Sequence, residues 1–225
     1  MELHEFEKSI DYIFKNKNLL RTALTHTSYA NEQNIESNEK LEFLGDAILE
    51  FVTSDYLYKK YTHLKEGEMT KVRASVVCED SLYKIAIKSN FSDFLFLGKS
   101  ELLSGNKIRA AILADSVEAV IAAIFLDSGI EETKKFIISN LEEEIEIASK
   151  HVGEKDHKTV LQEKLQAYKG SHIEYKIVAE SGPDHNKTFT AAVLLNGKML
   201  ASGIGKSKKT AQMDAAKNAI ANNKF

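Results

Sequence analysis

The hydrophobic pattern of the chain changes its period once, near residue 150, and this change constrains the fold more than any other feature. Before it, apolar residues recur at three- and four-residue spacing, as in amphipathic helices. The segments with this spacing are residues 16–26, 39–61, 69–89, 111–129 and 131–148. We expect Gly129 to end the fourth of these helices. After the change, residues 172–180 and 187–195 alternate apolar and polar side chains, as half-buried strands do. A chain of 225 residues is long enough for two domains, and we expect one of each kind.

The second part of the chain has the order helix, three antiparallel strands, helix. Asn196-Gly197 is a strong hairpin signal between two strand-like runs. A polar stretch that contains Gly153 separates the two parts. We therefore expect a helical domain at residues 1–147, a linker at 148–154 and an α+β domain at 155–225.

The net charge of −3 conceals an asymmetry between the two parts. Residues 1–153 hold 18 Lys+Arg against 26 Asp+Glu, whereas residues 154–225 hold 12 against 7. A basic second part suits a polyanionic partner, and an acidic first part would repel one unless cations intervene. The sequence shows no transmembrane stretch and no signal peptide, and it has the single cysteine Cys78. These features predict a cytoplasmic protein without disulfides and without a membrane partner.

The helix expected at residues 39–61 carries an acidic edge. Glu39, Glu42 and Asp46 fall within a sector of about 60° on a helical wheel, away from the apolar stripe. Gly45 lies in the interior of this helix, where glycine costs roughly 1 kcal/mol relative to alanine. A close approach of another helix at Gly45 would explain that cost.

A second acidic edge lies on the helix expected at residues 111–129. Asp115 and Glu118 share one face of it, beside small alanines. If the two helices pack together, their carboxylates would repel one another and raise each other's pKa, and a divalent cation would remove that cost. Oxygen ligands favour Mg²⁺, Mn²⁺ or Ca²⁺ over zinc. From the residues alone, two ordinary solvated helix faces remain an alternative.

Phe43 lies on the acidic side of its helix rather than in the apolar stripe. Such an aromatic is either incidentally exposed or in contact with a second subunit.

The second part of the chain offers residues suited to a phosphate backbone. Lys206, Lys208 and Lys209 stand at the start of the last helix, where free backbone N–H groups favour an anion. The loop at residues 181–187 contains the only proline, Pro183, and His185. Polar residues also follow one side of the helix that begins near residue 158. A solvated lysine cluster and an ordinary polar helix face are the alternatives.

Several separated motifs together resemble bacterial ribonuclease III. They are "THTSYA" at 25–30, "NEKLEFLGDA" at 38–47, "EGEMTKVRASVV" at 66–77 and "ILADSVEAVIAAIFLDSG" at 112–129. Residues 155–225 resemble a double-stranded-RNA-binding domain through "GPDHNKTF" and "GKSKKTAQMDAA". The resemblance covers nearly the whole chain in the family's order. Ala47 stands where the family often has serine, and this departure changes none of the expected catalytic acids.

The resemblance implies an all-α endonuclease domain followed by an α+β double-stranded-RNA-binding domain of order α-β-β-β-α. The catalytic carboxylates that it implies are Glu42, Asp46, Asp115 and Glu118. Of these, Glu42, Asp115 and Glu118 would bind Mg²⁺, with Mn²⁺ as a possible substitute. Glu39 and Glu66 match auxiliary acids, and Phe43 matches a residue that enters a socket on the partner in a homodimer.

The RNA-binding residues implied by the resemblance are Thr159, Gln162, Glu163, Gln166, Pro183, His185, Lys206, Ser207, Lys208 and Lys209. The expected reaction is Mg²⁺-dependent cleavage of double-stranded RNA to 5′-phosphate and 3′-hydroxyl ends with short 3′ overhangs. The expected substrates are ribosomal RNA precursors and some mRNAs and tRNAs.

Two other classes of protein are alternatives to a nuclease. A protein that only binds duplex RNA would not need all four acids. A di-iron oxidase would need Glu-x-x-His pairs, and none follows Glu39, Glu42 or Glu118.

Overall fold

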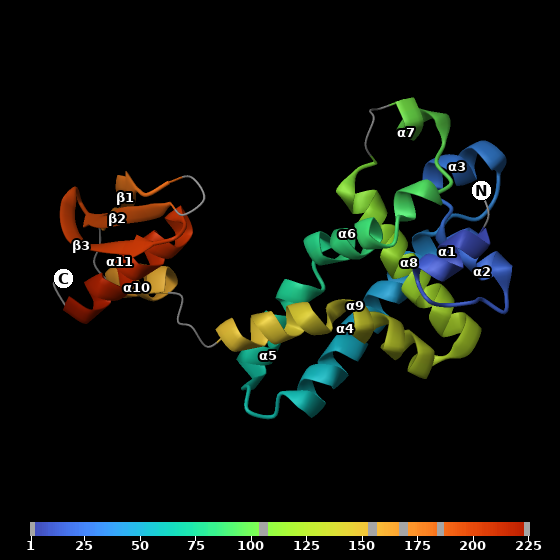
Figure 1. Ribbon diagram of the computed structural model, residues 1–225, viewed down its shortest axis with the longest axis horizontal. Coiled ribbons are helices and arrows are strands. Elements are labelled where there is room, and N and C mark those ends of the chain that lie inside the picture. Colours follow the sequence, from blue (N-terminus) through green and yellow to red (C-terminus); the bar gives the residue numbers. More distant parts are fainter. Residues whose placement is uncertain (1–2, 104–107, 153–156, 167–170, 184–186, 223–225) are drawn as a thin grey trace. The chain divides into compact units, whose positions relative to one another are not determined.

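The computed structural model of the protein describes residues 3–103, 108–152, 157–166, 171–183 and 187–222 (Figure 1). The chain divides into two compact units, Met1–Gly153 and Glu154–Phe225. The first unit is helical, and the second holds a three-stranded antiparallel sheet with helices, so the predicted fold classes are confirmed. Among the described residues, every helix is too short or too polar to cross a membrane.

The helices of the first unit alternate with short connections along the chain. They are α1 Leu3–Ser9, α2 Lys17–Ala23, α3 Thr27–Gln33, α4 Glu39–Lys60, α5 Glu66–Val76, α6 Glu79–Lys88, the 3-10 helix η1 Phe91–Asp93, α7 Lys99–Leu103, α8 Ala110–Ser128 and α9 Ile130–His151.

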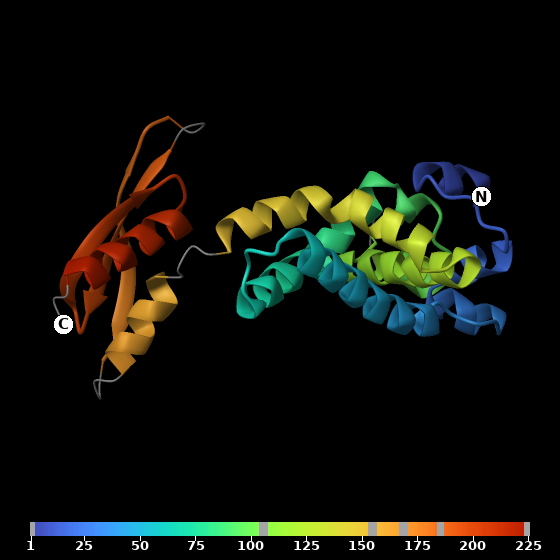
Figure 2. The same cartoon turned by 90° about the horizontal axis from the view of Figure 1, so that it is seen from below.

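Helix α8 is the centre of the first unit, and it contacts α2, α4, α6 and α9 (Figures 1 and 2). Its side chains are apolar around most of the circumference, and Val117, Ile121 and Ile124 are at most 1% exposed. A helix that is apolar on most sides belongs in a core. Gly129 ends α8 with a φ of 82°, which is unfavourable for other residues, and so stops the helix as predicted.

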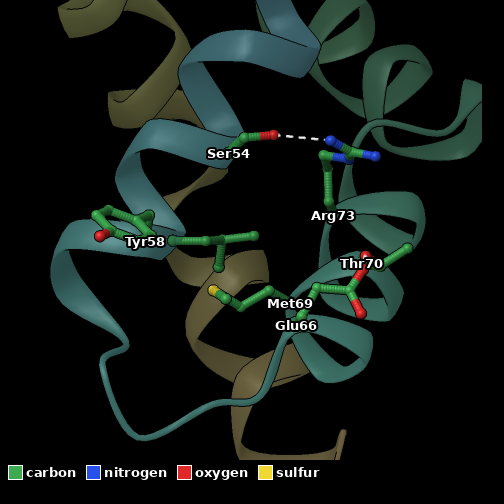
Figure 3. Close-up of a pocket in the computed structure, with 7 residues that line it drawn as sticks. Ser54, Tyr58, Glu66, Met69, Thr70 and Arg73 are labelled. Carbon is green, nitrogen blue, oxygen red and sulfur yellow. Dashed lines mark hydrogen bonds between the residues drawn. The ribbon is translucent and has the colours of Figure 1, made fainter.

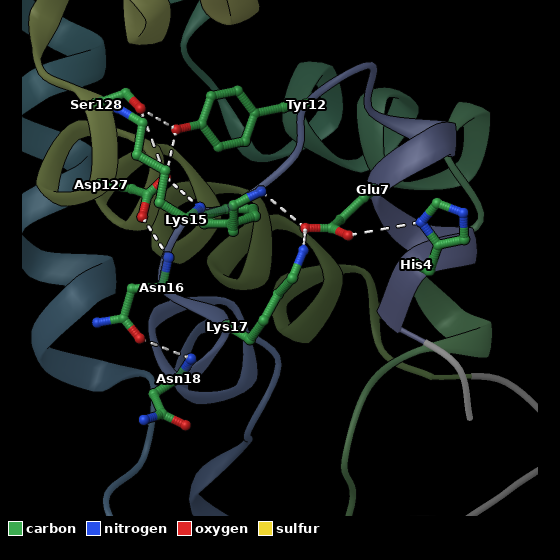
Figure 4. Close-up of polar contacts among 10 residues, drawn as sticks. His4, Glu7, Tyr12, Lys15, Asn16, Lys17, Asn18, Asp127 and Ser128 are labelled. Atoms are coloured by element: carbon green, nitrogen blue, oxygen red, sulfur yellow. Dashed lines mark hydrogen bonds and ion pairs between the residues drawn. The ribbon is translucent and has the colours of Figure 1, made fainter.

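A network of hydrogen bonds joins the segment between α1 and α2 to the end of α8 (Figure 4). Asp127 accepts hydrogen bonds from the backbone N–H groups of Lys15 at 2.9 Å and Asn16 at 2.8 Å, and from the hydroxyl of Tyr12 at 2.7 Å. Burial alone would raise the pKa of Asp127, but these hydrogen bonds outweigh it and lower the pKa below its ordinary 3.8. The ionised carboxylate therefore stabilises this connection.

Two parts of the helical prediction differ from the structure. Residues 69–89 form two helices rather than one, because Cys78 is extended and Glu79 and Asp80 begin α6 with favourable charge for a helix N-terminus. Helix α9 continues to His151, so the first four residues of the expected linker 148–154 are helical. Ala148 and Val152 pack against the core there, which the polar residues around them concealed.

The second unit is built from α10 His157–Gln166, β1 Ile173–Ser181, β2 Thr188–Leu195, β3 Lys198–Gly205 and α11 Lys208–Asn222. The sheet has the strand order β1-β2-β3. Helix α11 packs against β2, β3 and α10 (Figure 1). Asn196 and Gly197 have positive φ angles of 49° and 80°, as a two-residue hairpin turn requires, so the predicted turn is confirmed.

Candidate active site

The acidic edges of α4 and α8 meet because Gly45 allows the two helices to approach very closely. A Cβ atom on Gly45 would lie 1.9 Å from the carbonyl oxygen of Glu118, far inside van der Waals contact. Any side chain at this position would therefore push the helices apart. The close approach that the sequence predicted at Gly45 is confirmed.

Three carboxylates converge where the helices cross. One carboxylate oxygen from each of Glu42, Asp115 and Glu118 lies within 4.8 Å of the other two. Glu42 comes from α4, and α8 supplies Asp115 and Glu118 from positions three residues apart, which share a helix face. All three residues are half-buried. We call Glu42, Asp115 and Glu118 the acidic trio.

Burial and mutual repulsion disfavour three negative charges at this site. Burial, followed by the negative charges of three neighbouring acids, raises the pKa of Glu118 to about 8. Those neighbours are Asp46, Asp115 and Glu42. The pKa of Glu42 is raised by burial and then by the charges of Asp115, Glu39 and Asp46. Burial also raises the pKa of Asp115.

The acidic trio fits a divalent cation. A cation among the three carboxylates would offset both the burial and the repulsion that raise their pKa values. Because the donor atoms are all carboxylate oxygens, the site favours hard ions such as Mg²⁺, Mn²⁺ or Ca²⁺.

The other acids named from the sequence lie around the trio or apart from it. Asp46 is exposed one turn beyond Glu42 and outside the 4.8 Å group, but its charge still raises the pKa of Glu118. Glu39 is exposed and accepts a hydrogen bond from Ser37 Oγ at 2.9 Å. Glu66 begins α5 and lines a separate pocket. The structure thus gathers three of the four expected acids into one group, with Asp46 beside it.

Helix α4 carries an exposed phenylalanine near its start and lines a pocket further along its length. Phe43 is 81% exposed, and Phe51 and Tyr58 are also exposed further along α4. A pocket of about 340 Å³ opens between α4 and α5 (Figure 3). It is lined by Ser54, Leu57, Tyr58, Glu66, Met69, Thr70 and Arg73. Arg73 closes one side of it with a 2.9 Å hydrogen bond to Ser54 Oγ.

In the second unit, α10 buries Leu161 and Leu165 and exposes Thr159, Gln162 and Glu163. Gln166 is the last residue of this helix.

The N-terminus of α11 carries the expected basic cluster, with Lys206, Ser207, Lys208 and Lys209 all exposed. Pro183 is exposed as well, and His185 lies outside the described residues. The exposed residues named from the sequence thus occupy α10, the loop after β1 and the start of α11.

Comparison with known proteins identifies both units. A family model described as Ribonuclease-III-like matches residues 16–145, and one described as a double-stranded RNA binding motif matches residues 157–223. Ribonuclease 3 from Carboxydothermus hydrogenoformans is 46% identical over 221 residues, which cover 97% of this chain and 94% of that protein. The chain belongs to the ribonuclease III family. As a member, it is an endoribonuclease that acts on double-stranded RNA, and the resemblance seen in its motifs is confirmed.

Solved structures of the ribonuclease III family share the fold. A nuclease domain of ribonuclease III from Campylobacter jejuni, described for flexibility in a region involved in dimer formation, matches with a TM-score of 0.60 and 40% identity. The match covers 64% of this chain and 98% of that one. The structure of Dicer from Pichia stipitis matches with a TM-score of 0.50 and 24% identity. This match covers 95% of this chain and 97% of that one, and at this identity it supports the fold alone.

Sequence reasoning did not find the pocket between α4 and α5. One signal was present in the spacing of exposed aromatic residues along α4. Phe51 follows Phe43 by eight residues and Tyr58 follows Phe51 by seven, so the three lie on one side of the helix. The pocket itself depends on how α5 packs against α4, which no periodicity shows.

Proposed function

We propose that the chain cleaves double-stranded RNA with Mg²⁺, or with Mn²⁺ as a substitute, to leave 5′-phosphate and 3′-hydroxyl ends. The products carry short 3′ overhangs, and the substrates are ribosomal RNA precursors and some mRNAs and tRNAs in the cytoplasm. The observation that carries this proposal is the convergence of the acidic trio within 4.8 Å in a ribonuclease III family chain.

The residues of the acidic trio would hold the metal ion. When bound, Mg²⁺ would act as a Lewis acid that neutralises phosphate charge and lowers the pKa of a water molecule. Glu42 from α4 and the pair on α8 fix the ligand geometry, because both helices are anchored in the core. Gly45 keeps the two halves of the trio together.

Asp46 is the fourth essential acid in this proposal. Its carboxylate is exposed and lies outside the trio, so it is free to accept a hydrogen bond from a water molecule beside the metal site. The exposed Glu39 and Glu66 act as auxiliary acids that contact the substrate or organise the site.

We assign Phe43 to a homodimer contact, in which it enters the pocket between α4 and α5 of a second copy. Phe43 is 81% exposed and would be buried in such a contact, and the pocket offers Leu57, Tyr58 and Met69 as apolar partners. Since both features lie on one subunit, a two-fold axis would let each copy insert its phenylalanine into the other. Such a dimer aims one acidic site at each strand of a duplex.

The second unit supplies affinity for the duplex. Thr159, Gln162, Glu163 and Gln166 on α10 contact 2′-hydroxyl groups in the shallow minor groove of A-form RNA. Pro183 and His185 contribute from the loop after β1. Lys206, Ser207, Lys208 and Lys209 contact phosphates, so binding weakens as salt rises.

The test compares Glu118→Gln with the wild type in duplex binding and in Mg²⁺-dependent cleavage. Because loss of a group that merely supports a metal ligand costs roughly 10- to 100-fold, loss of a ligand should slow single-turnover cleavage by about 100-fold or more while binding persists. Glu143→Gln, the same change at an exposed position of α9, is the matched control and should cleave normally. Normal cleavage by Glu118→Gln would refute the site assignment, and end mapping of wild-type products tests the expected ends.

A further inference from the structure

A carboxylate lies within the basic cluster of the second unit. Glu180, near the end of β1, forms ion pairs with Lys187 and Lys208, each with a nitrogen–oxygen distance of 3.7 Å. The strand register sets Glu180 opposite Phe189 of β2. The ammonium group of Lys208 lies 5.9 Å from the centre of the Phe189 ring. Glu180 and Phe189 thus hold Lys208, the first residue of α11, against the end of the sheet.

Among the residues that the structure describes, further lysines lie close to Glu180. Lys206 donates a hydrogen bond to Thr188 Oγ1 at 3.2 Å, and Lys209 follows Lys208 on α11. Lys187, Lys206 and Lys208 therefore converge on the same end of the sheet, and Glu180 brings one negative charge among them.

These ion pairs contribute little to the stability of the fold. The side chains of Glu180 and Lys208 are 39% and 63% exposed, and exposed pairs of this kind are worth little because water screens them. The core of this unit is apolar and does not include Glu180.

We propose that Glu180 competes with RNA phosphates for Lys208 and Lys187 and so limits the affinity of the second unit for duplex RNA. This inference rests on the proposed function, in which Lys208 contacts a phosphate. A phosphate that reaches Lys208 must displace or share its carboxylate partner, and it also comes close to the negative charge of Glu180. Both effects oppose binding.

Limited affinity for duplex RNA favours release of the product after cleavage. Cleaved duplexes keep the same backbone shape as the substrate, so a binding surface that holds one tightly also holds the other. Glu180 acts as a positioning residue that sets how tightly the lysines hold either duplex, without contact with the reacting atoms.

The test measures binding of the full chain to a duplex of about 20 base pairs, longer than the roughly 16 that one such domain spans, in the presence of a chelator. Glu180→Gln is expected to bind about 2- to 10-fold more tightly. Its affinity should fall more steeply with salt, by about one unit in the slope of log K against log salt, since one more positive charge is available to phosphate. In cleavage, KM should fall while the single-turnover rate at saturating enzyme stays unchanged.

Glu174→Gln is the matched control. Glu174 lies on the same strand and pairs with Lys176 at 3.1 Å, so this variant makes the same charge change away from the cluster. Glu180→Asp keeps the charge and should bind like the wild type. If Glu180→Gln binds no more tightly than Glu174→Gln, the inference is wrong.

A lysine variant separates this inference from the proposed RNA surface. Lys208→Gln should weaken binding, and adding Glu180→Gln to it should give a smaller gain than in the wild-type background. If Lys208→Gln binds normally, the proposed phosphate contact itself fails. If it binds weakly but Glu180→Gln gives an equal gain in both backgrounds, only the competition between Glu180 and RNA for Lys208 is refuted.

Discussion

Substitution of Gly45 by alanine should disable the nuclease by separating two helices. The added Cβ would lie 1.9 Å from the carbonyl oxygen of Glu118, whereas ordinary contact begins at 3.4 Å. Backbone at the crossing must therefore move by about 1.5 Å, since neither atom is at the end of a flexible side chain. Overpacking of this kind costs up to about 3 kcal/mol, and the gain in helix propensity returns about 1 kcal/mol. We expect a net loss of about 2 kcal/mol in the free energy of unfolding.

The same movement separates Glu42 from the two acids of α8. Because a displacement of about 1 Å at a reacting site can cost roughly 100-fold in rate, single-turnover cleavage in Mg²⁺ should fall by about that factor. Urea unfolding and a cleavage time course measure the two effects on one preparation.

Gly67→Ala provides the control for Gly45→Ala. Gly67 lies in helix α5, and a Cβ there would meet no atom within 4 Å. This variant should be more stable by up to about 1 kcal/mol and should cleave at the wild-type rate. If Gly45→Ala behaves like Gly67→Ala in both assays, the close crossing does not hold the acidic trio together.

Three further predictions follow from the described contacts. Because burial and its acidic neighbours raise the pKa of Glu118 to about 8, we expect Glu118 to hold a proton at neutral pH and Mg²⁺ binding to release about one proton. Calorimetry in buffers of different ionisation enthalpy measures this release, and its persistence in Glu118→Gln would contradict the assignment. Phe43→Ala should raise the dissociation constant of the proposed dimer by roughly 1,000-fold, because two symmetric contacts worth about 2 kcal/mol each are lost. Sedimentation velocity measures the dimer, and Ile13→Ala, at another exposed apolar position, is the control. Asp127→Asn should cost about 1–3 kcal/mol at neutral pH. Because folding lowers the pKa of Asp127, the stability that the wild type has over Asp127→Asn is complete above pH 3.8 and is lost as the pH falls through the pKa of the folded protein. If urea unfolding at about pH 3 gives the same stability difference between the two proteins as at neutral pH, this reasoning is wrong.

The sequence predicted the parts of the fold that depend on local pattern. Gly129 ends α8, and Asn196-Gly197 turns the chain between β2 and β3, because both positions need positive φ. The helical wheel placed Glu42 on the edge of α4 that meets α8, and the unfavourable Gly45 marked where the helices cross. These features follow from periodicity and from the special conformations of glycine.

Features that depend on packing between elements were not predictable in the same way. Nothing in the pattern distinguished Asp46 from Glu42, yet their different rotation about α4 leaves Asp46 exposed and outside the trio. Likewise, Glu180 lies seven residues from Lys187 and far from Lys208 in sequence, and only the strand register and the start of α11 bring the three together.

Glu42 and Phe43 are consecutive residues near the start of the continuous helix α4. No hinge or loop separates the carboxylate that we assign to the metal from the ring that we assign to the other subunit. Any substitution that reshapes the subunit contact by rotating or sliding α4 therefore shifts a ligand of the ion as well. Sequence changes in the subunit contact are therefore limited by the need to keep Glu42 in place. A small molecule that binds at the subunit contact and shifts α4 would inhibit cleavage without touching the carboxylates.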